Sequence, residues 1–179
     1  TRSVAVTGVQ TCALPISKGA GTEQGIQPMY GVPYGVEIKP FLSPVGLPCK
    51  QPAWGYVAGV DLNTHQVVWK KRIGTIRDSL PKLFQLPALK IGVPGLGGSI
   101  STAGNVMFVA ATQDNYIRAY NVSNGDKLWE ARLPAGGQAT PMTYEINGKQ
   151  YLVIMAGGHG SFGTKMGDYL VAYALPDKK

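Results

Sequence analysis

The sequence has few cysteines, few charges and no long apolar run. Two cysteines among 179 residues allow at most one bridge, so no disulfide framework holds the fold together. Charged residues make up 15% of the chain, below the roughly 25% usual in soluble domains, which argues against a disordered polar segment. The longest apolar stretches, 106–111 and 151–156, are far shorter than the roughly 20 residues of a membrane helix. We therefore expect a globular core and no membrane span within this chain.

Basic residues outnumber acidic ones by 17 to 10, which gives a formal net charge of +7. Such an excess raises the question of a polyanionic partner. Lys70, Lys71 and Arg72 form the only tight basic cluster, however, and they follow a strand-like run. We therefore expect no nucleic-acid partner.

The first 16 residues, TRSVAVTGVQTCALPI, only superficially resemble a secretory signal. Polar residues interrupt their apolar region, and no clear cleavage site follows. Residues 6–16 read like the translation of a common sequencing adapter. We predict that residues 1–16 are an adapter-derived artefact outside the fold and that residues 17–179 form the domain. Cys49 is then the only cysteine of that domain, and a structural disulfide is not expected.

Short β-branched and aromatic runs bounded by Gly, Asn and Pro recur along the chain, and no window has sustained helical spacing. This pattern predicts an all-β fold. The Asn147-Gly148 dipeptide favours the two positive φ angles of a type I′ turn and so predicts a hairpin. The expected strands are 54–61, 66–72, 105–112, 116–121, 127–132, 139–146, 150–156 and 169–174.

An internal repeat organises these strands. Residues 56–69, YVAGVDLNTHQVVW, match residues 116–129, YIRAYNVSNGDKLW, and a partial third copy begins at Asp168. Multi-stranded repeats with periods of about 40 to 60 residues are typical of propeller blades, each of which must stack on its neighbours to bury both faces. We therefore predict that Trp69 and Trp129 dock between blades rather than take part in catalysis.

Two and a half copies are too few to close a ring of blades. We therefore expect the chain to be the carboxyl-terminal part of a propeller, comprising its last two to three blades. The last blade is expected to receive a strand from elsewhere.

The two repeats, with Gly125 in the second, resemble the tryptophan-docking repeat of propeller dehydrogenases that use pyrroloquinoline quinone (PQQ); His65 replaces the usual glycine in the first. Residues 40–56, 97–120 and 134–176 are similar to the end of membrane-bound PQQ-dependent (quinoprotein) glucose dehydrogenases. The segment GGHGSFGTKMGDY is the most specific part of this resemblance, which runs from about residue 25 to the last residue.

The resemblance implies part of an eight-bladed propeller that binds PQQ and a divalent cation, Mg²⁺ or Ca²⁺. It implies an enzyme that oxidises glucose or another aldose to its lactone and passes electrons to ubiquinone. It also implies a membrane anchor before this chain and a location at the periplasmic face of the bacterial inner membrane. In this family the general base and the main cation ligands lie upstream. We therefore expect no catalytic residue here, an unknown contribution to the metal site, and an inactive isolated chain.

Two polar residues lie in connections that a propeller brings to one face, where ligand sites gather. Asp114 lies in the turn TQDN, and His159 lies in the corresponding, longer connection GGHGSFGTKMGD of the next blade. The resemblance then assigns both residues to substrate binding, with cofactor binding as a further role for Asp114.

The residue chemistry leaves alternatives open at both positions. A neutral imidazole at His159 offers one donor and one acceptor, which suits a sugar hydroxyl and its ring oxygen, but a loop histidine can equally bond a neighbouring carbonyl. Asp114 can orient sugar hydroxyls, support the quinone site or hold its turn as an Asx motif.

Other residues carry weaker signals. Lys165 either pairs with Asp168 or faces solvent, and Gly97 and Gly98 either let the backbone approach a cofactor or simply precede a strand. Cys49 is expected to be a buried small hydrophobe rather than a nucleophile. Residues 74–98 form a long excursion over the predicted site face, with a role in substrate entry or acceptor access that their spacing does not decide.

Two other functions compete with glucose oxidation. A related PQQ-dependent membrane dehydrogenase for quinate or a polyol would share the cofactor and the quinone, and the loop sequence around His159 favours glucose over these. A non-catalytic PQQ-like propeller scaffold would keep the two tryptophans but has no need of the Gly-His-Gly loop or of Asp114. Fold arguments alone do not separate these functions.

Overall fold

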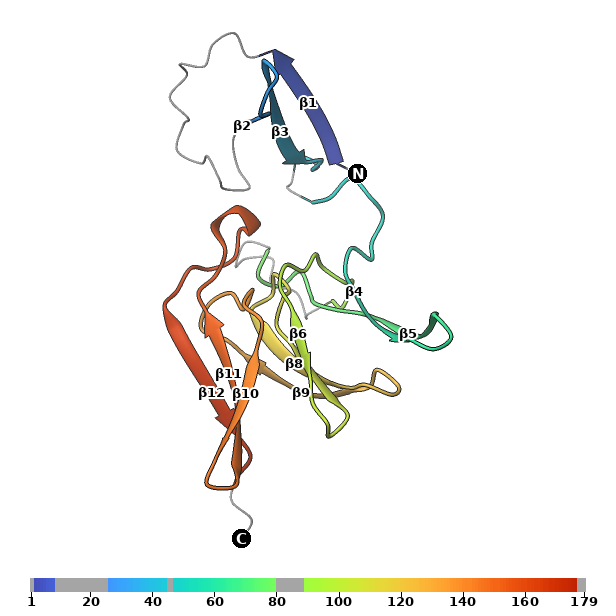
Figure 1. The fold of residues 1–179 in the computed structure, drawn as a ribbon, viewed down its shortest axis with the longest axis vertical. Helices are drawn as coiled ribbons and strands as arrows, with labels where there is room; N and C mark the ends of the chain where they lie inside the picture. Colours follow the sequence, from blue (N-terminus) through green and yellow to red (C-terminus); the bar gives the residue numbers. More distant parts are fainter. Residues whose placement is uncertain (1, 9–25, 45–46, 80–88, 177–179) are drawn as a thin grey trace. The chain divides into compact units, whose positions relative to one another are not determined.

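The computed structural model describes residues 2–8, 26–44, 47–79 and 89–176. The chain divides into two compact units, Thr1–Gln51 and Pro52–Lys179. The described residues form strands and one 3-10 turn, η2 (Gly160–Phe162) (Figure 1). Within these residues no helix has the length and apolar character needed to cross a membrane.

The first unit contains one antiparallel sheet, in which the central strand β3 pairs with β1 on one side and β2 on the other. Its strands are β1 (Arg2–Gly8), β2 (Ile26–Pro28) and β3 (Tyr34–Pro40). The pairing of β1 does not bear on the origin of residues 1–16, so their adapter derivation stays a prediction. Residues 9–16, including Cys12, lie outside the described residues.

The expectation that Cys49 is buried is wrong. Its thiol is free and exposed. The surrounding segment is tied down by one isolated bridge between Leu42 and Pro48 and by a backbone hydrogen bond from Cys49 N to Phe41 O of 3.2 Å. These links hold the chain near the surface, and the thiol stays in contact with solvent.

The second unit contains three separate antiparallel sheets, which we name blades 1 to 3 in chain order (Figure 1). Their strands lie in consecutive order within each sheet, as in a propeller. Blade 1 contributes β4 (Tyr56–Asp61) and β5 (Gln66–Arg72); blade 2 contains β6 (Ser99–Ser101), β7 (Val106–Val109), β8 (Tyr116–Asn121) and β9 (Lys127–Arg132); blade 3 contains β10 (Met142–Ile146), β11 (Lys149–Ala156) and β12 (Tyr169–Ala174). The predicted all-β, partial propeller is confirmed.

The two copies of the sequence repeat also share an irregularity in strand pairing. The β4–β5 pair shifts register after Gly59, which lies opposite Trp69, and the β8–β9 pair shifts after Ala119, which lies opposite Trp129. A bulge at the same place bends and twists both hairpins alike. It therefore gives the two tryptophans equivalent positions in their blades.

The predicted Asn147-Gly148 hairpin is confirmed. Asn147 has a φ of 51° and Gly148 a φ of 73°, and Ile146 pairs with Lys149 on either side of them. Three of the predicted strands are shorter than expected: residues 54–55 lie outside β4, residues 105 and 110–112 outside β7, and residues 139–141 outside β10. Strands β2, β3 and β6 lie outside the predicted ranges, because their glycine, proline and serine content hides the alternation that marks a strand. Strand β1 also lies outside them, in the segment predicted to be no part of the fold.

Blades 1 and 2 meet as the repeat predicts. The Trp69 indole N–H donates to Val122 O at 2.7 Å, and its ring lies so close to Gly125 that a Cβ there would come within 2.4 Å of it. The apolar cluster at this interface contains Ile73, Met107, Val109, Ala111 and Tyr120. The docking role predicted for Trp69 is confirmed.

Blades 2 and 3 share a more apolar interface. Ile117 and Ile154 are almost completely buried there, and each contributes about 1.5–3 kcal/mol by that burial. Trp129 contacts Tyr173 of blade 3 edge-on, with ring centroids 5.0 Å apart. Within the described residues blade 3 has three strands, and β12 is the outermost of them.

Candidate functional site

The strand order places two loops at the same end of neighbouring blades. Residues 110–115 join β7 to β8, and residues 157–168 join β11 to β12. Because successive strands are antiparallel, both loops lie at the end opposite the Asn147-Gly148 hairpin. Asp114 and His159 are therefore on the same face of adjacent blades, which is the placement that the repeat alignment predicts.

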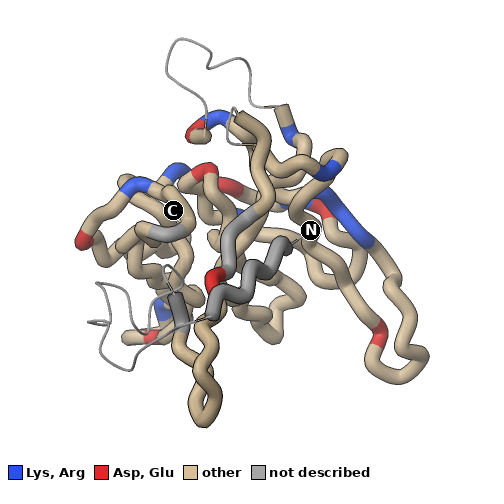
Figure 2. Tube along the Cα trace, turned by 90° about the horizontal axis from the view of Figure 1, so that it is seen from above, with Lys and Arg blue, Asp and Glu red and all other residues tan. Residues whose placement is uncertain are grey.

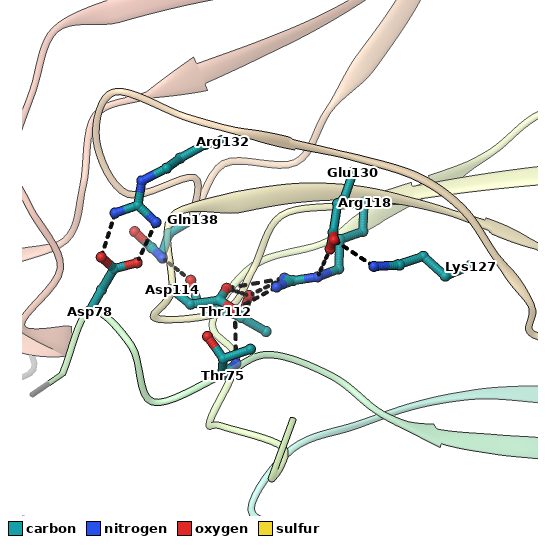
Figure 3. A network of polar contacts seen from close by, with 9 residues as sticks. All are labelled: Thr75, Asp78, Thr112, Asp114, Arg118, Lys127, Glu130, Arg132 and Gln138. Atoms are coloured by element: carbon teal, nitrogen blue, oxygen red, sulfur yellow. Dashed lines mark hydrogen bonds and ion pairs between the residues drawn. The ribbon is translucent and has the colours of Figure 1, made fainter. Parts of the chain in front are cut away.

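Asp114 is completely buried, and both of its carboxylate oxygens accept hydrogen bonds (Figure 3). Oδ1 accepts from Thr112 Oγ1 at 2.6 Å and from Arg118 Nη1 at 3.0 Å. Oδ2 accepts from Thr75 N at 2.8 Å and from Arg118 Nη2. The bidentate partner Arg118 is itself only 4% exposed.

The electrostatics of this pair keep both groups charged. Burial raises the pKa of Asp114, but the hydrogen bonds and charge of Arg118, with the Thr112 hydroxyl and the Thr75 N–H, lower it by more, so that the net shift is downward. Burial likewise lowers the pKa of Arg118, and Asp114 raises it by more. The result is a buried, internally satisfied ion pair.

This arrangement bears on the three roles considered for Asp114. Two of its partners, Thr75 and Arg118, lie outside the turn, so the carboxylate does not hold the turn through a local Asx motif. All four hydrogen bonds point into the protein, which favours a role in positioning the loop over direct ligand contact. Contact with the sugar or with PQQ stays a prediction.

Further ion pairs surround this centre (Figure 3). Glu130 lies 3.5 Å from Arg118 Nε and 2.6 Å from Lys127 Nζ. Asp78 accepts from Arg132, one of the two hydrogen bonds being 3.1 Å long. Basic and acidic residues thus pair around the Asp114 centre, while Lys70, Lys71 and Arg72 form a separate basic run. Figure 2 shows basic and acidic positions in the tube of the chain.

These contacts fix the start and the end of the 74–98 excursion. Thr75 is bonded to Asp114 and Asp78 to Arg132, while Val93 N donates to Ile73 O at 2.8 Å and so closes the base of the excursion. Residues 80–88 lie outside the described residues. The role of the excursion in substrate or acceptor access stays a prediction.

The His159 loop is built on glycines. Gly158 has a φ of 73°, and a Cβ there would come within 2.2 Å of Lys165 O. Its N–H donates to Gly136 O at 2.9 Å. His159 follows in an extended conformation, half-buried, and its N–H donates to Thr164 Oγ1 at 2.8 Å. Glycine at position 158 therefore lets the backbone of this loop pack closely against Lys165.

The two loops touch each other. Gln113, next to Asp114, donates from Nε2 to Phe162 O in the His159 loop at 3.0 Å. The pair of loops thus forms one surface that spans two blades, with the His159 side chain at its less buried part.

Sequence reasoning missed three residues of this region: Arg118, Gln138 and Thr164. A signal existed for Arg118, because a lone charge within the apolar strand YIRAY calls for a buried partner. No comparable signal marks Gln138 or Thr164, since polar residues in loops are ordinarily solvated.

The structure also places the residues that carry weaker signals in the sequence. Lys165 is exposed and, among the described residues, does not pair with Asp168. A Cβ at Gly97 would come within 2.3 Å of Gln138 O, and one at Gly98 within 2.4 Å of Thr140 Oγ1. These glycines allow the neighbouring chain segment to pack closely, and Gly98 directly precedes β6.

A cavity of about 220 Å³ lies between β5 of blade 1 and strands β8 and β9 of blade 2, and it borders the Asp114 centre at Thr75 and Arg118. Its lining includes Lys71, Arg72, Lys90 and Lys127, and neither His159 nor any other residue of its loop contributes. We place the candidate site at the two loops rather than at this cavity, because the loops bring Asp114 and His159 to the same face of adjacent blades.

A metal ion and an anionic quinone make different demands on the side chains around them. The described residues contain no group of three or more His, Cys, Asp or Glu side chains that suits a metal ion. The guanidinium groups of Arg118 and Arg132, which a carboxylate-bearing quinone would attract, are engaged by Asp114 and Asp78. Cofactor binding by Asp114 stays a prediction, and the contribution of this chain to the cation site stays unknown.

Comparison with known proteins defines the class. Residues 6–152 match the family described as "PQQ: Glucose/ethanol/alcohol dehydrogenase, beta-propeller domain". The chain belongs to this family of PQQ propeller domains.

Relatives narrow the comparison further. The chain is 90% identical over 163 residues to quinoprotein glucose dehydrogenase A of Acinetobacter calcoaceticus, which covers 91% of the chain and 20% of that protein. It is 47% identical over 158 residues to a quinate/shikimate dehydrogenase (quinone) of Acinetobacter baylyi, which covers 86% of the chain and 19% of that protein. The chain thus spans about a fifth of the length of these relatives.

A solved structure supports the fold alone. The quinohemoprotein alcohol dehydrogenase of Comamonas testosteroni superimposes with a TM-score of 0.51 at 20% sequence identity, covering 80% of this chain and 20% of that one. The partial propeller described above is therefore the arrangement expected of this family.

Proposed function

We propose that this chain is part of a PQQ-dependent dehydrogenase that oxidises glucose, or another aldose, to its lactone and passes electrons to ubiquinone. The observation that carries this proposal is the 90% identity to a quinoprotein glucose dehydrogenase, against 47% to a quinate/shikimate dehydrogenase over a similar length. The difference favours glucose over the related substrate. A non-catalytic scaffold is less favoured, because it has no need of the Gly-His-Gly loop that this chain contains.

His159 is the residue of this chain that we propose to contact the sugar. It lies half-buried on the loop face, on a backbone that glycines hold close to the neighbouring blade. An imidazole can donate one hydrogen bond and accept another, and this matches a sugar hydroxyl beside a ring oxygen. The role of this chain is then to bind and orient the substrate, while proton transfer belongs to residues outside it.

The remaining parts of the proposal concern groups outside this chain. PQQ, when bound, supplies the two-electron acceptor, and a divalent cation, Mg²⁺ or Ca²⁺, supplies Lewis acidity beside it. The resemblance of the sequence to membrane-bound glucose dehydrogenases supports an anchored protein at the periplasmic face of the inner membrane. The isolated chain is expected neither to retain PQQ nor to turn over glucose.

The test is His159→Ala in a full-length quinoprotein glucose dehydrogenase that carries this sequence. We expect the KM for glucose to rise about tenfold or more, since losing one or two hydrogen bonds costs on the order of 1–3 kcal/mol, while bound PQQ is retained. The matched control is His65→Ala, which changes the other histidine of the chain, in the β4–β5 turn at the opposite end of a blade. Steady-state kinetics with glucose and quinate are the measurement.

Two outcomes would contradict the proposal in different ways. An unchanged glucose KM in the His159→Ala enzyme would remove His159 from the sugar site. Turnover of quinate or a polyol but not of glucose by the unmodified enzyme would replace glucose with the alternative substrate class.

A further inference from the structure

A chain of hydrogen bonds connects the His159 backbone to the buried Asp114 centre. The His159 N–H donates to Thr164 Oγ1 at 2.8 Å, and that hydroxyl donates to Gln138 Oε1 at 2.8 Å. Gln138 Nε2 in turn donates to Thr112 O at 3.1 Å. The Thr112 hydroxyl donates to Asp114, which completes the link from blade 3 to blade 2.

Each polar atom in this series of hydrogen bonds has a definite donor or acceptor role. A hydroxyl carries one proton, and Thr164 Oγ1 lies 3.5 Å from His159 O but only 2.8 Å from Gln138 Oε1, so the proton is directed to Gln138. The Gln138 amide then has its oxygen toward blade 3 and its nitrogen toward blade 2. Since Thr164 is only 7% exposed, water is poorly placed to substitute for these bonds.

The packing around Gln138 leaves room for this link and for little else. A Cβ at Gly136 would come within 2.4 Å of Gln138 Oε1 and 2.5 Å of Thr164 Oγ1. Gly136 also bonds the His159 loop on both sides, accepting from Gly158 N and donating to Lys165 O, each at 2.9 Å. The segment between blades 2 and 3 is thereby shaped to hold the His159 loop.

We propose that Gln138 and Thr164 are positioning residues that set where the His159 imidazole stands relative to blade 2. The inference rests on the proposed function, because it assumes that His159 contacts the sugar. Thr164 fixes the His159 backbone nitrogen, which is bonded to the Cα that carries the imidazole side chain, and Gln138 ties the Thr164 hydroxyl to the rigid turn held by Asp114 and Arg118. Neither residue contacts substrate in this scheme.

The expected consequence is a selective loss of substrate binding. Removing the Thr164 hydroxyl leaves the His159 N–H and the Gln138 carbonyl oxygen without their partner, so the loop shifts to satisfy them. Displacement of a binding group by about 1 Å can change kinetics up to 100-fold, and we expect the glucose KM to rise about tenfold. The kcat at saturating glucose is expected to change less than threefold, about 0.65 kcal/mol.

The experiment uses the full-length PQQ-loaded enzyme with Thr164→Val, Thr164→Ser and Gln138→Met. Valine removes the hydroxyl at nearly constant volume, whereas serine keeps it and should restore the KM to within about twofold of the unmodified enzyme. Thr102→Val is the matched control, because it removes a threonine hydroxyl bonded to a backbone carbonyl, Val106 O at 3.1 Å, in the β6–β7 turn at the other end of blade 2. Glucose KM, kcat and PQQ content are measured for each.

A double-variant comparison separates positioning from general stability. If Thr164 acts through His159, Thr164→Val should raise the KM of the unmodified enzyme but add less than twofold in a His159→Ala background. Equal effects in both backgrounds, or an unchanged KM in folded Thr164→Val enzyme, would overturn the inference. If the Thr164→Val enzyme does not accumulate, Gln138→Met replaces it, because Gln138 is only half-buried. Its effect on the glucose KM is then compared in the unmodified and His159→Ala backgrounds in the same way.

The failure of the inference is distinct from failure of the proposed function. An effect of His159→Ala without an effect of Thr164→Val or Gln138→Met refutes the positioning role and leaves the sugar contact standing. No effect of His159→Ala on the glucose KM refutes the sugar contact itself, and the positioning inference falls with it.

Discussion

The two loops at the site face are built in opposite ways. The β7–β8 loop spans residues 110–115 and buries a charged pair, Asp114 and Arg118, whose hydrogen bonds are satisfied inside the protein. The β11–β12 loop spans residues 157–168, contains several glycines and keeps His159 half-buried. The first loop is held by side-chain charge, and the second is held by backbone contacts together with uncharged side-chain hydrogen bonds through Thr164 and Gln113.

This difference indicates a division of labour between the loops. A buried ion pair is rigid because either charge alone would be strongly penalised. A glycine-rich loop can approach a ligand closely but needs an external support to stay in place. The short loop is that support, through Gln113 bonded to Phe162 O and Gln138 bonded to Thr112 O.

Removing one charge of the pair should have the largest effect. Arg118→Met leaves Asp114 ionised and buried without its partner, and such changes destabilise a protein by about 3–5 kcal/mol. We expect a clear fall in the apparent melting temperature of the full-length protein, together with faster proteolysis near residues 110–115. The double variant Asp114→Asn with Arg118→Met should recover part of the loss. Equal stability of Arg118→Met and the unmodified protein would show that the short loop is not held by this pair.

Acid provides a milder way to remove the same charge. The pKa of Asp114 is lower in the folded protein than its ordinary value of 3.8, so its ionisation stabilises the fold above pH 3.8 and this contribution is lost as the pH falls through the folded-state pKa. The effect should be smaller than that of Arg118→Met, because the protonated carboxyl keeps part of its hydrogen bonding. Urea unfolding between pH 2.5 and 6, with pH values chosen around 3.8, measures it. Asp114→Asn should flatten this pH dependence, and Asp168→Asn, an exposed control, should not.

The long loop should respond to backbone changes instead. Gly158→Ala places a Cβ at a positive φ and within 2.2 Å of Lys165 O, which should cost about 1–3 kcal/mol locally and loosen the loop. Gly160→Ala is the matched control, because nothing lies within 4 Å of its added Cβ, and its effect should stay within about 0.5 kcal/mol. Proteolysis of the loop in both variants provides the comparison. A similar protease sensitivity would mean that the close approach at Gly158 does not hold the loop.

The repeat made much of the fold predictable from sequence. Trp69 and Trp129 recur at matching positions of the repeat, so both the blades and their docking could be inferred. The Asn147-Gly148 turn was equally predictable, because the preference of these two residues for positive φ angles is a local property. Strand β6 was not, because Ser99–Ser101 lacks the apolar alternation and depends on pairing with β7.

The candidate site was predictable in position but not in chemistry. The repeat placed Asp114 and His159 on one face, since that requires only strand order. The partners of Asp114 include Thr75, which is 39 residues away in the chain and reaches it only when the excursion folds back. The link through Gln138 likewise joins residues 26 positions apart on either side. Such contacts depend on tertiary packing that no local pattern encodes.

The unequal surroundings of the two docking tryptophans offer an optical measure of blade assembly. The Trp69 indole N–H is bonded to Val122 O, whereas Trp129 remains 37% exposed beside Tyr173 on the outermost described strand. Whatever packs next against that strand will change the polarity around Trp129 more than around Trp69. In a protein whose only tryptophan is Trp129, the wavelength of maximum fluorescence emission would therefore report the packing of further chain against β12.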